Sequence, residues 1–248
     1  MQRRAKLLLA TPVLIVLALA SCSTRTASKE DDKKAAINAV LAHELACQTY
    51  DFDKLDSLHT PDSQGIEESY PQPFEPGARG SYQAFKDAGI RIDYHPQDAV
   101  AEVRGDVAWV TVTLHSVWTA DTPAGLAMLG VREGYATYVE SFILVKTPAG
   151  WKIALGHTSQ LPPDFGVEAD FQQGHGGMKL AKVDERGAAA KAGFKSGDVL
   201  IEYGGRKIDS PVDYQRLRYA YYEREKVMVT VLRGNEKVTK EVTLEEMK

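Results

Sequence analysis

Hydrophobic and polar positions follow a helical period in the first part of the chain after residue 33. The pattern predicts a helix that begins at Lys34. Its apolar stripe comprises Ile37, Val40, Leu41, Leu45 and Ala46. Further helices are expected at 54–58 and at 81–88, where Ser81 is placed to act as the N-cap. Residues 61–80 are rich in proline and glycine and are expected to form a loop.

The period changes to two in the middle of the chain. The segment "VAEVRGDVAWVTVTLHSVWTA" alternates like a strand pair that turns at 104–106. The segment "YATYVESFILVKTPAGWKIALGHTSQ" is expected to form a second pair, which turns at 147–150. Helices followed by antiparallel strands predict an α+β domain with helices on one face of a curved sheet.

A new pattern begins after Pro162 and Pro163, which mark a domain boundary. Short strands are expected at 167–171, 178–183, 199–203, 227–233 and 236–244. A one-turn helix is expected at 188–192 and ends at Gly193 in the left-handed conformation. A longer helix is expected from Ser210, with Pro211 in its first turn, to about Glu225. The pattern therefore predicts a second, β-rich domain with two helices.

The N-terminus resembles a bacterial lipoprotein signal. Basic residues precede an apolar run of 13 residues, Leu7 to Leu19, which is shorter than the roughly 20 residues of a membrane-spanning helix and typical of a secretion signal. The following "LASC" resembles the lipobox of bacterial lipoproteins. This resemblance implies a signal peptide at 1–21, a diacylglyceryl group and a fatty acid such as palmitate on Cys22, and a tether at 22–33. An ordinary signal peptide that is cut near Ala20 stays open as the alternative.

The implied location is the cell envelope, with a lipid anchor in a membrane. In Gram-negative lipoproteins, a residue other than Asp after the cysteine implies the outer membrane, so Ser23 indicates its periplasmic face.

Composition narrows the classes of partner and cofactor. The chain has 30 basic and 34 acidic residues and a formal net charge of −4, without a basic patch, which argues against nucleic acid. Cys47 is left without a disulfide partner once Cys22 is lipidated, and its helical context predicts a small buried residue. The six histidines have no ligand-like spacing, so neither a metal site nor a cofactor is expected.

Three segments of the first domain carry a family resemblance. These are "YDFDKLDSLHT", "GDVAWVTVT" and "GWKIALGHTS". They resemble the SnoaL-like branch of the nuclear-transport-factor-2-like superfamily over residues 34–160. The resemblance implies a cone-shaped domain with a pocket between helix and sheet. Some members are isomerases, cyclases or dehydratases, and others bind ligands or dimerise.

Five side chains are candidates to point into this cone: Trp109, His115, Tyr138, Glu140 and His157. Acid–base catalysis needs a carboxylate or histidine near the substrate. Tyr138, Glu140 and His157 are therefore the weak catalytic candidates. The alternative is that these residues line an inert pocket or a dimer face, with His157 as a structural residue.

The second domain, residues 162–246, resembles a bacterial PDZ domain of the kind fused to envelope proteases. The segment "GAAAKAGFKSGDVLIEYGGRKI" carries the resemblance. It implies that the "DFGV" loop presents backbone N–H groups to a peptide's terminal carboxylate and that the next strand accepts the peptide as an added strand. The peptide-binding residues implied are Phe165, Gly166, Val167, Glu168, Ala169, Tyr214, Leu217, Arg218 and Tyr221. Tyr214 and Leu217 fit the core of the domain equally well.

One feature of this loop departs from the family pattern. Asp164 and Glu168 bring negative charge to a site that would receive a carboxylate. The partner is therefore a protein C-terminus or an internal peptide segment, and packing against a neighbouring domain stays open as well.

Three functions follow from these patterns. The first is a non-enzymatic envelope lipoprotein that binds proteins through its PDZ domain, while the cone domain binds a small ligand or forms a homodimer. The second is an enzyme of the cone domain, targeted by the PDZ domain. The third is a partner that presents substrates to an envelope protease. The chain itself has no recognisable protease nucleophile segment.

Overall fold

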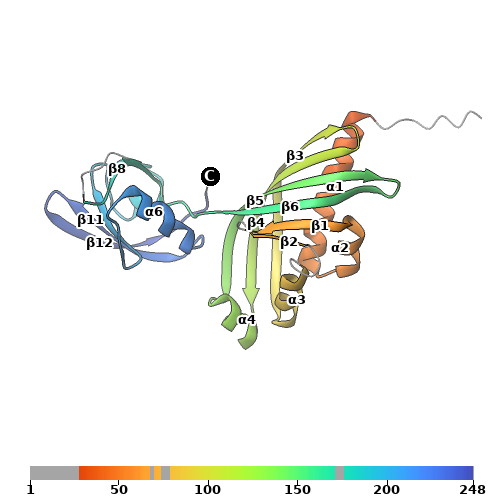
Figure 1. Cartoon of the computed structure of the whole chain (residues 1–248). Coiled ribbons are helices and arrows are strands. Elements are labelled where there is room, and N and C mark those ends of the chain that lie inside the picture. Colours follow the sequence, from red (N-terminus) through yellow and green to blue (C-terminus); the bar gives the residue numbers. More distant parts are fainter. Residues whose placement is uncertain (1–27, 68–69, 74–78, 171–175, 248) are drawn as a thin grey trace, which may run out of the picture.

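In a computed structural model the chain forms two β-rich domains that are joined by a long strand (Figure 1). The structure describes residues 28–67, 70–73, 79–170 and 176–247. The expected signal peptide, Cys22 and the first part of the tether lie outside these residues. No helix in these ranges is long and apolar enough to span a bilayer.

The first domain is a helix-covered sheet, as expected for an α+β fold. Its strands have the order β2-β1-β6-β5-β4-β3, and α1 lies along the sheet (Figure 1). Its elements are α1 (Lys29–Thr49), α2 (Phe52–Leu58), β1 (His59–Glu67), β2 (Tyr70–Pro73), α3 (Arg79–Asp87), β3 (Ile90–Arg104), β4 (Val107–Ala120), α4 (Pro123–Leu129), β5 (Glu133–Thr147) and β6 (Gly150–Leu161).

Helix α1 begins earlier than its apolar pattern predicts. Ser28 and Asp31 form a capping box, which satisfies the first free N–H groups of the helix. Residues 29–33, expected in the tether, therefore form the first turns of α1. The buried face also differs from the expected stripe, because Leu45 is 59% exposed while His43 and Glu44 are buried.

The segment 61–80 was expected to be a loop, but it contains strands. Strand β1 pairs with β6 in parallel and with β2 in antiparallel fashion, so the sheet is mixed rather than purely antiparallel. Helix α3 starts at Arg79, which places Ser81 inside the helix and not at its cap. Pattern analysis also missed α4, which is capped by Thr122 and begins with Pro123.

The second domain has the strand order β12-β11-β9-β8-β7, with β10 paired to β9. Its elements are β7 (Val167–Asp170), β8 (Met178–Val183), α5 (Ala188–Lys191), β9 (Val199–Tyr203), β10 (Arg206–Lys207), α6 (Pro211–Leu217), a 3₁₀ turn (Arg218–Ala220), β11 (Lys226–Arg233) and β12 (Glu236–Thr243). Helix α6 is capped by Ser210 as expected, but it ends at Leu217 instead of near Glu225.

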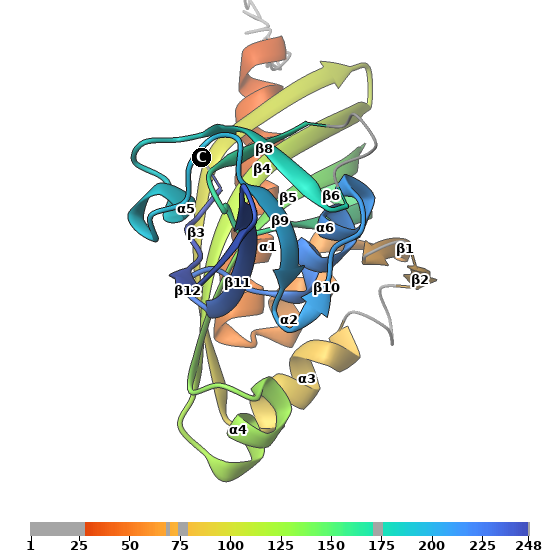
Figure 2. The same cartoon turned by 90° about the vertical axis from the view of Figure 1, so that its left-hand side faces the viewer.

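Side chains of the two domains also make contact beyond the strand that joins them; Figure 2 shows the second domain in front of the first. Strand β6 continues to Leu161, which pairs with Thr137 of β5. The Thr137 hydroxyl donates to the buried Glu223 carboxylate at 2.6 Å. Nearby, the Arg224 guanidinium stacks 3.7 Å above the Tyr135 ring. The second domain is thus docked on β4 and β5 of the first.

Candidate functional site

The "DFGV" loop begins the second domain in a fixed conformation. Gly166 has a φ of +76°, and a Cβ at this position would lie 2.8 Å from the Gly187 Cα. Only glycine fits such a left-handed position against another backbone. The Gly166 carbonyl accepts a hydrogen bond from the Asp184 N–H at 2.9 Å, which ties the loop to the end of β8.

Phe165 anchors the same loop in the hydrophobic core. Its side chain is 1% exposed, and its ring contacts those of Phe194, Tyr203 and Tyr214 at centroid distances of 6.0, 5.9 and 6.2 Å. Phe165 therefore supports the loop from inside the domain, and its buried side chain holds Gly166 in place.

Strand β7 follows the loop and forms the edge of its sheet. It pairs with β8 in the register Val167–Val183 and Glu168–Lys182. Within the described residues, no other strand pairs with its outer side. An edge strand leaves backbone N–H and C=O groups available, which allows an extended segment to add to the sheet.

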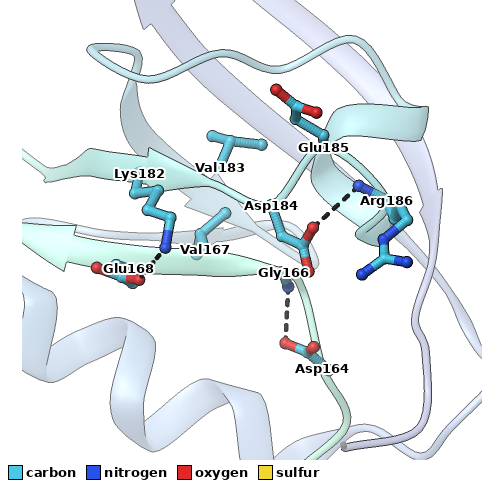
Figure 3. A pocket seen from close by; sticks show the side chains of 9 residues that line it. All are labelled: Asp164, Gly166, Val167, Glu168, Lys182, Val183, Asp184, Glu185 and Arg186. Carbon is cyan, nitrogen blue, oxygen red and sulfur yellow. Dashed lines mark hydrogen bonds and ion pairs between the residues drawn. The ribbon is translucent and has the colours of Figure 1, made fainter.

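A hollow of about 710 Å³ lies beside the start of β7 (Figure 3). Its lining residues are Asp164, Gly166, Val167, Glu168, Lys182, Val183, Asp184, Glu185 and Arg186. The Asp164 carboxylate accepts a hydrogen bond from the Gly166 N–H at 2.7 Å. The Asp184 carboxylate accepts one from the Arg186 N–H at 3.0 Å.

The structure brings only part of the expected peptide site together. Gly166, Val167 and Glu168 line the hollow, and Ala169 follows them on β7. The helical residues do not line this hollow. Tyr214 is buried, Leu217 and Tyr221 pack against the core, and the Arg218 guanidinium lies 5.9 Å from the Tyr214 ring centroid.

Pattern analysis missed the wall formed by 182–186. Lys182 and Val183 end β8, and 184–186 lie in the turn toward α5, where no motif marks them. The cross-strand pairing of β7 with β8 brings them beside the loop.

The cone domain contains a second cluster of polar side chains, in its interior. Glu44 of α1 and Glu140 of β5 are 2% and 7% exposed. The Thr158 hydroxyl donates to Glu140 at 3.0 Å. Burial raises the pKa of Glu44 well above its ordinary value, and a hydrogen-bonded neighbour, Glu140, raises it further. Two carboxyl groups in this position favour sharing a proton.

Two histidines and a serine, linked by hydrogen bonds, lie next to this pair of carboxyl groups. The His43 Nδ1 and His59 Nε2 atoms are 3.0 Å apart, and His59 Nδ1 is 3.1 Å from the Ser63 hydroxyl. Burial lowers the pKa of His43 to about 3 and that of His59 to about 4, so both rings are neutral at pH 7. A cavity of about 40 Å³ lies among these groups and is lined by His43, His59, Gln64, Gly65, Ile66, Tyr82, Glu140, Phe142, Gly156 and Thr158.

The expected catalytic candidates are divided between the two faces of this sheet. Tyr138 and Glu140 share the inner face, because they are two residues apart on β5. His157 pairs with Ser141 and lies on the outer face, in a shallow hollow of about 400 Å³ with Trp109. His115 is also on the outer face, where it meets Glu246 of the second domain at 2.9 Å.

The sequence patterns therefore indicated Glu140 but not its partner Glu44, the buried His43 or the half-buried His59. The sequence did contain one signal for His43 and Glu44: these two polar residues interrupt the apolar face of α1.

Comparison with known proteins identifies both domains. Residues 35–163 match the family model of the SnoaL-like domain, and the chain belongs to this family. Residues 163–244 match the model of the PDZ domain.

Relatives of the PDZ segment include HtrA-type proteins. A "Serine protease HtrA-like" from Staphylococcus epidermidis is 34% identical over 59 residues, which cover 24% of this chain and 10% of that protein. A "Serine protease Do-like HtrA" from Lactobacillus helveticus is 36% identical over 69 residues, or 28% and 17% of the two chains. The matched part thus spans less than a fifth of either relative.

Solved structures resemble the first domain. A protein of the NTF2-like family from Streptomyces avermitilis is 21% identical, with a TM-score of 0.47, over 54% of this chain and 99% of that one.

Proposed function

We propose that this protein is a membrane-anchored lipoprotein of the cell envelope that binds segments of other proteins through its PDZ domain. The observation that carries the proposal is the open edge of β7, which starts at a loop fixed by Gly166. A peptide that adds to such an edge as a further strand is held by main-chain hydrogen bonds, and this binding needs no catalytic residues. The family match of residues 163–244 supports this role.

A peptide array tests the binding function. The purified protein would be titrated with twelve-residue peptides, and the best binder repeated with Gly166→Trp. A tryptophan cannot adopt the Gly166 conformation beside Gly187, so we expect binding to fall at least tenfold. Gly105→Trp, at a turn of the cone domain with open space around it, is the control. Absence of binding to every peptide, or equal binding by the Gly166 variant, would contradict the proposal.

The lipid anchor is the second part of the proposal. The diacylglyceryl group and the additional fatty acid on Cys22 would supply three acyl chains, which is more than the two lipid signals that stable anchoring needs. Residues 22–28 would separate the lipid from α1. Anchoring at the periplasmic face of the outer membrane would act by holding the PDZ domain at high local concentration near its partners. Metabolic labelling with palmitate tests it: wild type takes up the label and sediments with membranes, whereas Cys22→Ser does neither.

A homodimer through the cone domain is the third part. The outer face of the sheet exposes the apolar side chains of Trp109 (38%), Val139 (37%) and Ile143 (43%). Apolar patches of this kind are typical of protein interfaces. Sedimentation velocity of wild type and Ile143→Lys tests it, since a charge at this face is expected to yield monomers; a wild-type monomer would contradict it.

Acid–base chemistry in the cone is the second candidate function, and the Glu44–Glu140 pair favours it. A carboxyl group kept protonated beside an ionised one can donate and accept a proton in the same cavity. Exchange of α-protons in a panel of ketones in deuterated water tests this function. Faster exchange with wild type than with Glu140→Gln would support it, and equal rates would exclude these substrates.

A further inference from the structure

We propose that the PDZ domain binds a segment from within a protein chain, with lysine or arginine where the segment passes the hollow, in preference to a free C-terminus. The inference rests on the proposed peptide-binding function and names the class of partner. Three features support this preference: the Gly166 loop, the hollow beside it and the charged residues that line the hollow (Figure 3).

One of the backbone donors that a terminal carboxylate would use is already engaged. The Gly166 N–H donates to the Asp164 carboxylate at 2.7 Å. Asp164 is itself held in place by two backbone hydrogen bonds with Glu245, of 2.7 and 3.0 Å. An incoming carboxylate would have to displace the Asp164 side chain and then lie beside a like charge, which disfavours it.

The hollow has room for a chain that continues. A segment that pairs antiparallel with β7 passes Asp170 first and approaches Val167 last. A peptide that ended there would stop at the Gly166 loop. The hollow of about 710 Å³ lies at this end of the strand, between the loop and residues 182–186. Because its second wall is the end of β8, a segment that continues past the Gly166 loop would turn over the end of β7 to enter it.

The charge of the lining favours a basic segment. Four of the lining residues are acidic (Asp164, Glu168, Asp184 and Glu185) and two are basic (Lys182 and Arg186), so the lining has a formal charge of −2. Lys182 is already paired with Glu168 at 2.9 Å. This excess of acidic residues gives the hollow a negative potential, so cationic side chains complement it and acidic ones are repelled.

Matched peptides test the proposal. Each binder from the array is synthesised as a free acid, as a C-terminal amide and with four further residues after its last position. A second set replaces the residues at the extended end with lysine or glutamate. We expect wild type to bind the amide and the extended form at least as tightly as the free acid. We expect the lysine form to bind about tenfold more tightly than the glutamate form at low salt.

Two substitutions separate the charge of Asp164 from its hydrogen bond. Asp164→Asn keeps an acceptor for the Gly166 N–H but removes the charge, so the acid and amide should bind about equally. Asp164→Ala frees the donor, and the free acid should then bind about tenfold more tightly than in wild type. Glu236→Ala, on β12 at the opposite edge of the sheet, is the control and should leave the acid-to-amide ratio unchanged.

The outcomes distinguish this inference from the proposed function. If wild type binds the free acid tenfold more tightly than the amide, the domain reads a C-terminus and the inference is wrong, while peptide binding stands. If glutamate is preferred to lysine, the charge argument fails. If no peptide binds in any form, the proposed function fails together with the inference.

Discussion

Gly166 and Gly193 have similar backbone dihedrals but different surroundings. Their φ angles are +76° and +88°, yet a Cβ at Gly166 would meet the Gly187 backbone at 2.8 Å, whereas one at Gly193 would meet nothing within 4 Å. We expect Gly193→Ala to lower the free energy of unfolding by about 1–2 kcal/mol, the cost of the left-handed conformation. Gly166→Ala should cost about 3 kcal/mol or more, because the clash adds to that cost. Thermal unfolding followed by circular dichroism would measure both, and equal losses would contradict the packing argument.

Glu44 should make stability depend on pH. Its pKa is raised in the folded state by burial and by Glu140, so the folded chain holds a proton that the unfolded chain releases above pH 4.5. Stability from this group is therefore present at low pH and lost as pH rises through 4.5, by up to about 1.4 kcal/mol per pH unit. We expect Glu44→Gln to gain stability relative to wild type between pH 4.5 and 7. The exposed Glu185→Gln is the control, and parallel unfolding curves for wild type and Glu44→Gln would contradict the prediction.

At the scale of elements, the two long hairpins and the PDZ strands could be predicted because alternation and turn residues agree. The β3–β4 and β5–β6 turns fall at 105–106 and 148–149, as expected. Strand β1 could not be predicted, because its parallel partner β6 lies about 90 residues later and its other partner, β2, is a short strand in a proline-containing segment. The start of α1 was missed for the opposite reason: a local cap, and not apolar spacing, sets it.

Asp198, which follows Gly197 in the turn before β9, is hydrogen-bonded to the distant strand β11, and this connection can be tested. The Asp198 carboxylate is 2% exposed and accepts hydrogen bonds from Arg233 of β11 at 2.9 and 2.8 Å and from the Lys195 N–H at 2.9 Å. Burial alone would raise the pKa of Asp198, but these hydrogen bonds outweigh it and hold the pKa below 3.8. The stabilisation is therefore present above pH 3.8 and lost as pH falls.

We expect Asp198→Asn to lower the free energy of unfolding by about 2 kcal/mol at pH 7, and by less at pH 3. Asp209→Asn is the matched control, because its partner Lys207 and Asp209 itself are exposed and such pairs contribute little. Chemical denaturation at the two pH values would measure both variants. A loss that persists at pH 3 would show that charge is not the cause.

At the scale of the whole molecule, the candidate sites are formed by residues that lie far apart in the sequence. Glu44 meets Glu140 only because α1 lies along the sheet that contains β5, and Asp184 reaches the Gly166 loop only because β8 pairs with β7. Sequence motifs placed the domains and the loop at 164–167. They could not supply these contacts, because each depends on how the sheets pair and on which face a helix buries.

The docking of the two domains gives the last prediction. The Glu223 carboxylate is 7% exposed and accepts the Thr137 hydroxyl hydrogen bond, while Tyr222 and Trp118 meet edge to face at 6.2 Å. Burial raises the pKa of Glu223, although the Thr137 hydrogen bond opposes this shift. Glu223→Ala should remove the buried hydrogen bond to Thr137 of β5, at a cost of about 1–3 kcal/mol.

Domain interfaces of modest size move by default when such contacts are lost. We therefore expect a larger radius of gyration by small-angle scattering for Glu223→Ala, with the changed fluorescence of Trp118 as a second signal. Glu241→Ala, on the exposed β11–β12 hairpin, is the control. Because Tyr222 to Arg224 connect α6 to β11, a rigid interface would hold the PDZ domain in one orientation relative to the cone. An unchanged scattering profile would mean that the remaining contacts, including Arg224 on Tyr135, are sufficient for this.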